Sequence, residues 1–190
     1  MRWWSGAIAV GALVLACASP IQTDHDTSPS ADFSRYATYA WVSEAPLSGA
    51  AAGPGSENYV SRVDESMIRR AVDAELAARG YRLAPPNAAD LVVGFEVGSQ
   101  KKVVQQQVPG RTTVYSGGYG YGDWYRSAPV RTRTYTEGTL SLEFFARESK
   151  QAVWVGWASK RLAASDDPEA LIQDAVARIL KPFPARRSAP

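Results

Sequence analysis

Three stretches of the sequence alternate between apolar and polar residues, the period of a β-strand with one buried face. Between Ala89 and Val97 every second residue is large and apolar, as expected when successive side chains point to opposite faces of a sheet. The same period recurs over residues 131–145 and 152–162, and the polar run 147–150 between them predicts a tight turn. The last two stretches are therefore predicted to pair as an antiparallel hairpin.

The two strands of this hairpin each have a predicted inner face. One face gathers the apolar residues Leu140, Leu142 and Phe144 of the first strand and Val153, Val155 and Trp157 of the second. The opposite face then carries Phe145, Trp154, Glu143 and Lys160. Two interpretations of that face stay open: Phe145 and Trp154 cover each other across the hairpin, or the face meets a partner.

Two segments repeat apolar residues at helical spacing. The first runs from about Glu57 to Arg79, and Gly80 suits the position just after a helix. The second begins at the acidic run 165–169, where a cap precedes Pro168, and ends at Lys181. With a strand over residues 36–42, the predicted fold class is α+β. We expect a two-layer sandwich in which an antiparallel sheet has two helices packed on one face.

The N-terminus predicts where the protein resides. The charge-free run Gly6–Ala16 is shorter than the about 20 apolar residues of a membrane-spanning helix, so residues 1–16 are predicted to be a signal peptide. The run ends in Leu-Val-Leu-Ala-Cys at Cys17, which resembles the bacterial lipobox. That resemblance implies that Cys17 carries a diacylglyceryl group and becomes the acylated N-terminus. Ala18 then favours the outer membrane of a Gram-negative cell, with the protein facing the periplasm.

Two alternatives for this end of the chain stay open. Ala16-Cys17-Ala18 also fits ordinary secretory cleavage, which releases a soluble periplasmic protein that begins at Ser19. An uncleaved anchor would instead leave Cys17 as a buried thiol. In every case the chain has one cysteine, which excludes an intrachain disulfide and a multi-thiolate zinc site.

Residues 17–31 are predicted to be a flexible tether. They are small and polar and include two prolines, so they offer little apolar surface to bury. The only histidine, His25, lies here between Asp24 and Asp26. Metal ligands must converge from a rigid scaffold, so no metal site is predicted. The remaining chain divides into one domain over residues 32–184 and a frayed tail over 185–190.

Six short blocks in order resemble the bacterial lipoproteins grouped as domain of unknown function 4136. The resemblance covers about Asp32 to Pro184 and rests on Asp32-Phe33-Ser34 with Tyr36 to Trp41, Ala71 to Tyr81, Ala89 to Val93, Tyr135 to Leu140, Val153 to Ala158 and Ile172 to Leu180. It implies an anchored periplasmic α+β domain. It implies no reaction, and the lipid-bearing Cys17 is the one functional residue that it supplies.

The residues offer no recognisable catalytic constellation. A serine triad needs a histidine held by a carboxylate, and the only histidine lies in the predicted tether. Paired carboxylates such as Asp123 and Glu137 would meet only if the fold brought them together. The sequence therefore predicts a protein that is not an enzyme and needs no cofactor. The net charge of +2 lacks the basic footprint of a nucleic-acid binder.

A glycine-rich, aromatic loop is predicted over about residues 109–130. Its candidate binding residues are Tyr115, Tyr119, Tyr121, Trp124, Tyr125 and Arg126, because aromatic rings in such a loop can stack on sugars or rest at a membrane interface. Expected partners are the membrane through the N-terminal lipid, and an envelope protein, a lipid or a cell-wall polymer through the loop. The favoured hypothesis is a non-enzymatic envelope adaptor. The alternatives are a carrier that holds an apolar ligand between helices and sheet, and an uncharacterised hydrolase.

Overall fold

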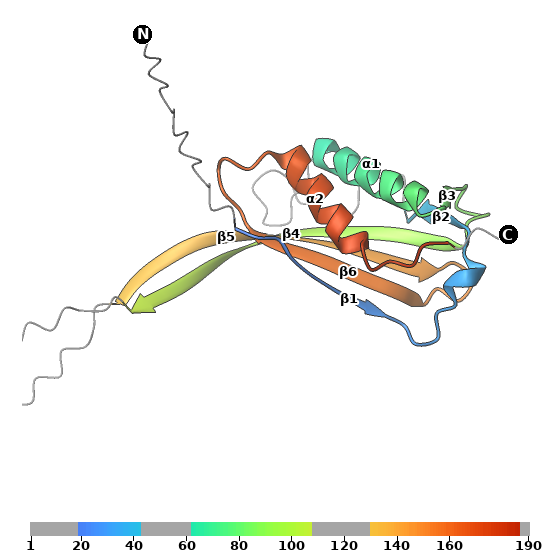
Figure 1. Cartoon of the computed structure of the whole chain (residues 1–190), viewed down its shortest axis with the longest axis horizontal. Coiled ribbons are helices and arrows are strands. Elements are labelled where there is room, and N and C mark those ends of the chain that lie inside the picture. The colour runs from blue at the N-terminus through green and yellow to red at the C-terminus, as the bar shows by residue number, and fades with distance from the viewer. Residues whose placement is uncertain (1–18, 43–61, 108–129, 187–190) are drawn as a thin grey trace, which may run out of the picture.

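Two helices cover one face of a six-stranded sheet in the computed structural model, which describes residues 19–42, 62–107 and 130–186 (Figure 1). The strands lie in the order β1-β6-β5-β4-β2-β3. Their bounds are β1 Gln22–Thr27, β2 Thr38–Trp41, β3 Arg82–Leu83, β4 Leu91–Gln107, β5 Val130–Ala146 and β6 Ala152–Arg161. A short 3-10 helix, η1 (Phe33–Arg35), precedes β2, and the α-helices are α1 (Arg62–Ala78) and α2 (Pro168–Leu180). The predicted α+β sandwich is confirmed.

The sheet is mixed, which corrects the prediction of a wholly antiparallel one. β1, β6, β5 and β4 pair antiparallel, but β2 pairs parallel with both β4 and β3. Tyr39 lies opposite Leu91 in one parallel pair, and Thr38 lies opposite Arg82 in the other. The chain returns from β2 to β3 through α1, and a strand–helix–strand connection of this kind favours parallel pairing.

The prediction of a flexible tether over residues 17–31 is wrong for β1. Gln22 pairs with Ser159 and Thr27 with Trp154, so β1 forms one edge of the sheet. An edge strand is held mainly by backbone hydrogen bonds, which a polar sequence can make as well as an apolar one. His25 therefore lies on a strand, where its ring stacks on Trp154 at a centroid distance of 6.1 Å.

From Trp154 onward the inner face of β6 is the opposite of the predicted one, whereas Val153 is buried as predicted. Trp154, Gly156 and Ala158 face the helices, whereas Trp157 lies on the other side and is partly exposed. Trp154 pairs with Phe144 across the hairpin, and their rings meet edge to face at 5.5 Å. The predicted pairing of Trp154 with Phe145 is wrong because the register shifts between Phe144 and Phe145. An extra residue at such a bulge reverses which side chains share a face.

The helix boundaries follow the sequence signals where the structure describes them. Asp167 caps α2 by accepting a hydrogen bond from the Ala170 amide at 2.8 Å, and Pro168 opens the helix, as predicted. Gly80 follows α1 with a φ of 86°, in the left-handed region that glycine adopts at least cost. The predicted start of this helix at Glu57 lies outside the described residues. Of the predicted tail 185–190, Arg186 is held by a hydrogen bond from its amide to the Arg79 carbonyl.

β4 and β5 extend well beyond the helices as a two-stranded ribbon (Figure 1). β6 ends at Arg161, opposite Glu137, and past that point β4 and β5 pair only with each other among the described strands. We call residues 100–107 and 130–137 the arm and the rest of the described fold the body. The side chains of Val103 and Val104 on the arm are 61% and 42% exposed. The predicted loop over 109–130 lies outside the described residues, apart from Val130 at the start of β5.

Candidate ligand pocket between the helices and the sheet

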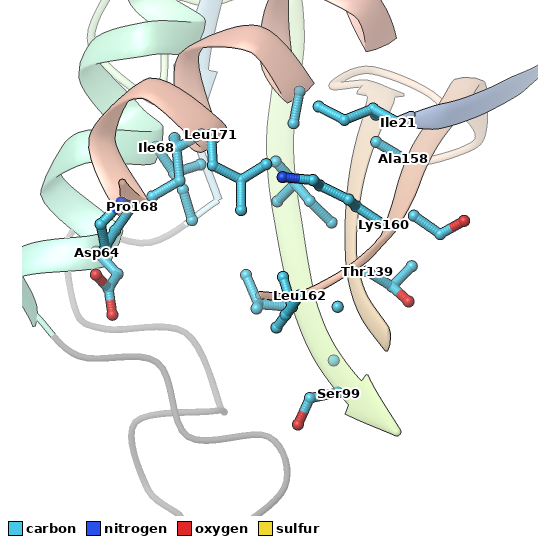
Figure 2. Close-up of a pocket in the computed structure, with 17 residues that line it drawn as sticks. Ile21, Asp64, Ile68, Ser99, Thr139, Ala158, Lys160, Leu162, Pro168 and Leu171 are labelled. Carbon is cyan, nitrogen blue, oxygen red and sulfur yellow. The ribbon is translucent and has the colours of Figure 1, made fainter. Parts of the chain in front are cut away.

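An apolar pocket lies between the two layers near the N-terminal ends of α1 and α2. Its volume is about 310 Å³. Figure 2 shows Ile68 and Leu171 of the helices on one side and Ala158 of β6 on the other. The main apolar lining residues are Ile21, Ile68, Val97, Leu140, Ala158, Leu162, Leu171, Ile172 and Ala175.

Small side chains on facing elements leave this space unfilled. Ala158 on β6 and Ala175 on α2 both line the pocket, and both are nearly buried. Elsewhere between the layers the same positions hold large rings, such as Trp154 on β6, which packs against Phe183 and Phe144. Protein interiors are otherwise close-packed, so the pocket arises where alanines on both layers leave space that larger side chains fill elsewhere.

Gly138 and Leu162 shape the pocket at the end near the arm. A Cβ atom added to Gly138 would lie 3.1 Å from both methyl carbons of Leu162. The missing side chain at Gly138 therefore lets Leu162 lie close against β5. Leu162 stays 40% exposed, so an apolar side chain borders the opening of the pocket.

Lys160 lines one wall of the pocket, and its charge is paired with Asp166, which is not part of the lining. The aliphatic stem of Lys160 runs along the lining (Figure 2), and its Nζ donates to Asp166 Oδ1 at 2.6 Å. That hydrogen bond, together with one from the Ala163 amide, holds the pKa of Asp166 below its usual value. The pocket thus combines an apolar interior with ionised groups at its edge, which suits a molecule with an apolar body and a polar end.

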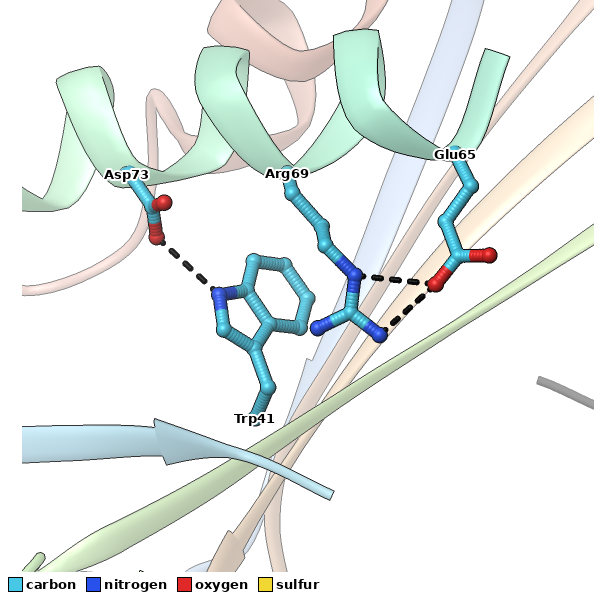
Figure 3. Close-up of polar contacts among 4 residues, drawn as sticks. All are labelled: Trp41, Glu65, Arg69 and Asp73. Atoms are coloured by element: carbon cyan, nitrogen blue, oxygen red, sulfur yellow. Dashed lines mark hydrogen bonds and ion pairs between the residues drawn. The ribbon is translucent and has the colours of Figure 1, made fainter. Parts of the chain in front are cut away.

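A second group of polar residues lies between α1 and β2 (Figure 3). Asp73 accepts hydrogen bonds from Tyr39 Oη at 2.7 Å and Trp41 Nε1 at 3.1 Å. Arg69 pairs with Glu65 at 2.8 Å and lies over the Trp41 ring, 4.7 Å from its centroid. Burial and the Asp73 carboxylate raise the pKa of Tyr39. These groups satisfy one another, so we assign the cluster to holding α1 on the sheet.

The predicted binding residues lie outside the part of the chain that the structure describes. This holds for Cys17 and for Tyr115, Tyr119, Tyr121, Trp124, Tyr125 and Arg126. Asp123 of the considered carboxylate pair lies outside it too, and its partner Glu137 accepts a hydrogen bond from Lys102 at 2.5 Å. Within residues 19–42, 62–107 and 130–186, no three histidine, cysteine or acidic side chains are grouped to hold a metal. No helix in those ranges is long and apolar enough to cross a membrane.

No direct signal in the sequence marks the pocket residues. A pocket is a place where side chains are too small to meet, and Ala158 and Ala175 have the same apolar character as filled core positions. Only the pairing of β5 with β6 and the packing of α2 bring these small residues together. The one usable signal is the alternation of Gly156, Ala158 and Lys160 on β6, which contains no large apolar side chain.

Comparisons with known proteins give a family and a fold. The family model described as domain of unknown function (DUF4136) matches residues 21–185. No curated protein matches the sequence. A solved structure of a DUF4136 family protein from Bacteroides thetaiotaomicron superposes with a TM-score of 0.50 at 16% identity, covering 85% of this chain and 94% of that one. The PelC dodecamer from Paraburkholderia phytofirmans gives a TM-score of 0.49 at 12% identity, covering 88% of this chain and 100% of that one.

Proposed function

This chain belongs to the DUF4136 family, and from that premise we propose that it is a lipid-anchored envelope protein that binds an apolar ligand in the helix–sheet pocket. The observation that carries the proposal is the pocket of about 310 Å³ between the two layers. Small-molecule sites are typically apolar clefts of about 300–1,000 Å³ with a few placed polar groups. The pocket has this composition and lies at the small end of the size range.

The lining indicates the chemical class of the ligand. Leu140, Leu171 and Ile172 offer aliphatic contacts, and burying such surface contributes about 25 cal/mol per Å². Lys160 of the lining is paired with Asp166, so both charge signs lie beside the pocket. We therefore propose that the ligand is amphipathic and inserts a short aliphatic chain, with its polar end near Lys160. The volume suits part of an acyl chain better than a whole two-chain lipid.

The pocket supports the carrier hypothesis over the adaptor hypothesis. The adaptor hypothesis rests on the aromatic residues between Tyr115 and Arg126, which lie outside the described residues, so it stays a prediction. The carrier hypothesis required space between helices and sheet, and that space is present. We propose binding and not catalysis because the side chains that enclose the space are mainly aliphatic.

The short stretch of chain between Cys17 and Ile21 supports a location of the pocket close to the membrane. Ile21 lines the pocket and lies four residues after Cys17. A chain spans at most about 3.6 Å per residue, so a lipid on Cys17 would hold the pocket within about 15 Å of the bilayer surface. A ligand of lipid origin then has a short path from the membrane to the opening.

We expect Cys17→Ser to move the protein from the membrane fraction to the soluble fraction. Each buried methylene of an anchor contributes about 0.8 kcal/mol, and two or three chains anchor a protein stably. The measurement is immunoblotting of fractionated cells, with Ser19→Ala as the control because it leaves the thiol in place. Unchanged fractionation of Cys17→Ser would contradict the anchor while leaving the pocket proposal intact.

We expect Ala158→Leu to weaken ligand binding at least about tenfold, because the larger side chain occupies the pocket that Ala158 now borders. A tenfold change corresponds to about 1.4 kcal/mol. Binding is measured by the fluorescence of N-phenyl-1-naphthylamine and its displacement by decanoate. The matched control is Ala152→Leu, the same change at an exposed position of β6.

Thermal unfolding of both variants checks that they keep the fold. The carrier proposal is wrong if the native chain shows no saturable, decanoate-sensitive fluorescence, or if both leucine variants bind as the native chain does.

A further inference from the structure

One face of the sheet has no helix over it among the described residues, and in the body this face is acidic. We call the side of β1, β4, β5 and β6 that points away from the helices the open face. On β5 the residues Leu140, Leu142 and Phe144 are buried under the helices, so Glu143 points to the open face. The pairing of Asp24 with Trp157 and of Glu96 with Ser141 places those acids on the same side. Within the body these four strands present four acids there, and their one lysine or arginine on that face is Arg161, at the end of β6 beside the arm; the acids are Asp24, Asp26, Glu96 and Glu143.

The same face of the arm is basic. Arg131, Arg133 and Tyr135 each lie an even number of residues before Glu143 on β5, so they share its face. Lys102 of β4 pairs with Tyr135. Arg161 of β6 lies at the root of the arm, with its guanidinium 3.9 Å from the Tyr135 ring centroid. The open face of the arm region thus carries the four cations Lys102, Arg131, Arg133 and Arg161 and one acid, Glu137. The other face of the arm carries a single charge, Lys101.

Acidic and basic residues lie at equal distances from one point of the sheet. Ser99 of β4 pairs with Gly138 of β5. Glu96 and Lys102 lie three residues to either side of Ser99, and Glu143 and Arg133 lie five residues to either side of Gly138. At about 3.3 Å per residue, Glu96 and Glu143 therefore each have a base at the same distance on the other side of one rung of the sheet. Glu137, the other acid of the open face on these strands, is paired with Lys102 within its own chain.

We propose that two copies of the chain associate through their open faces, with the arm of each copy lying over the body of the other. A two-fold axis across the strands at the rung of Ser99 and Gly138 brings Glu96 of one copy over Lys102 of its partner. The same rotation brings Glu143 over Arg133. A two-fold interface uses the same patch on both copies, so every such contact occurs twice. Two sheets packed face to face lie about 10 Å apart, which long side chains of this kind span.

The apolar residues of the open face add to this fit. Trp157 is partly exposed on the body, at the level of Ser141, and Val104 is partly exposed on the arm. Ser141 and Tyr135 lie three residues to either side of Gly138, so the two-fold rotation brings Ser141 over Tyr135 of the partner copy and Trp157, on the neighbouring strand, beside that tyrosine. Aromatic rings in the centre of a patch are the usual energetic anchors of an interface.

The N-terminal ends agree with this arrangement. An axis that runs across the strands keeps β1 of both copies on the same edge of the pair. Gln22 pairs with Ser159, which pairs with Thr139, one position from Gly138. The first strand of each copy therefore begins close to the axis, on the same edge of the dimer. This places the two N-terminal ends on one side, where lipids on both Cys17 residues insert into the same membrane. An anionic membrane surface would match only the basic half of the open face, whereas a second copy matches both halves.

The test is the mass of the full-length acylated chain in detergent micelles, measured by size-exclusion chromatography with light scattering. We expect a dimer for the native chain and a dissociation constant at least about tenfold higher for Arg133→Glu and for Glu143→Arg. Ionic strength raised from 0.1 to 1 M shortens the screening length from about 10 to about 3 Å and should weaken the dimer as well. The double variant Arg133→Glu/Glu143→Arg exchanges the two charges within each contact and should restore the dimer.

Lys101→Glu is the matched control, because it reverses a charge on the other face of the arm and should leave the dimer intact. Thermal unfolding verifies that each variant is folded. A native chain that is monomeric at 100 µM overturns the proposal, and so does a double variant that dissociates as readily as the single ones. Equal loss of the dimer in Lys101→Glu would also overturn it, because the open face would then have no special role.

Discussion

Gly156→Ala is expected to lower the free energy of unfolding by about 3 kcal/mol or more, near the upper range for overpacked cores. An added Cβ atom at this position would lie 2.1 Å from Cη2 and 2.7 Å from Cζ3 of Trp154, and 2.9 Å from Cγ2 of Ile179. Trp154 and Ile179 are each 1% exposed, so neither can move aside without disturbing the core. For a domain of this size the midpoint of thermal unfolding should fall by roughly 10 °C.

Gly98→Ala is the matched control for this change. Gly98 also lies in a strand, but an added Cβ atom there meets no other atom within 4 Å. Its effect should lie within about 0.5 kcal/mol, the usual range for substitutions that disturb no special feature. Both variants are compared by thermal and urea unfolding.

A second variant separates the steric cause from other causes. Trp154 Nε1 has no hydrogen-bond partner among the described residues, so Trp154→Phe removes ring volume without removing a hydrogen bond that the structure shows. We expect Gly156→Ala to cost clearly less in the Trp154→Phe background than in the native chain. Equal costs in the two backgrounds would contradict the clash as the cause, because residues in contact should couple.

Local patterns predicted the parts of the fold that depend on one element at a time. The acidic cap and proline of α2 and the glycine after α1 act through their own backbone, so neighbouring residues were enough to find them. The alternation over Leu91, Val93 and Phe95 had only one apolar face, and that face is the buried one.

The predictions were wrong where the apolar pattern of a segment fits two possible inner faces, or where a strand shows no apolar pattern. On β6 both faces contain apolar residues, Val153 with Val155 on one and Trp154 with Ala158 on the other. The choice depends on the register shift at Phe144 and on the helices above, which periodicity along one strand cannot reveal. β1 has no apolar alternation, and its place in the sheet comes from backbone pairing with β6.

Asp90→Ala is expected to lower the free energy of unfolding by about 3 kcal/mol, because several hydrogen bonds to one carboxylate are lost together. Asp90 Oδ2 accepts from the Ala37 amide at 2.8 Å, the Thr38 amide at 2.9 Å and the Thr38 hydroxyl at 2.8 Å. These bonds fix the start of β2 beside the start of β4, where the parallel pairing begins. Without the carboxylate, two partly buried backbone amides lose their acceptor.

The same contacts predict how stability depends on pH. Burial alone would raise the pKa of Asp90, but the hydrogen bonds from Ala37 and Thr38 and the charge of Arg147 hold it below its ordinary value. A carboxyl whose pKa is lowered on folding stabilises the folded state above its unfolded pKa of about 3.9. That contribution is lost as the pH falls through the lower folded pKa. Asp90→Asn should therefore be less stable than the native chain at pH 7, and the difference should shrink below about pH 4.

Asp174→Asn is the control for both Asp90 substitutions. Asp174 lies on the exposed side of α2 and pairs with Arg178, and both side chains are about half exposed. An exposed pair of this kind contributes about 0–1 kcal/mol, so the control should change little at any pH. Urea unfolding between pH 2.5 and 7 measures all three variants. If the difference between the native chain and Asp90→Asn is constant over that range, the ionised carboxylate is not the group that joins β2 to β4, because only an ionising group can give a difference that disappears in acid.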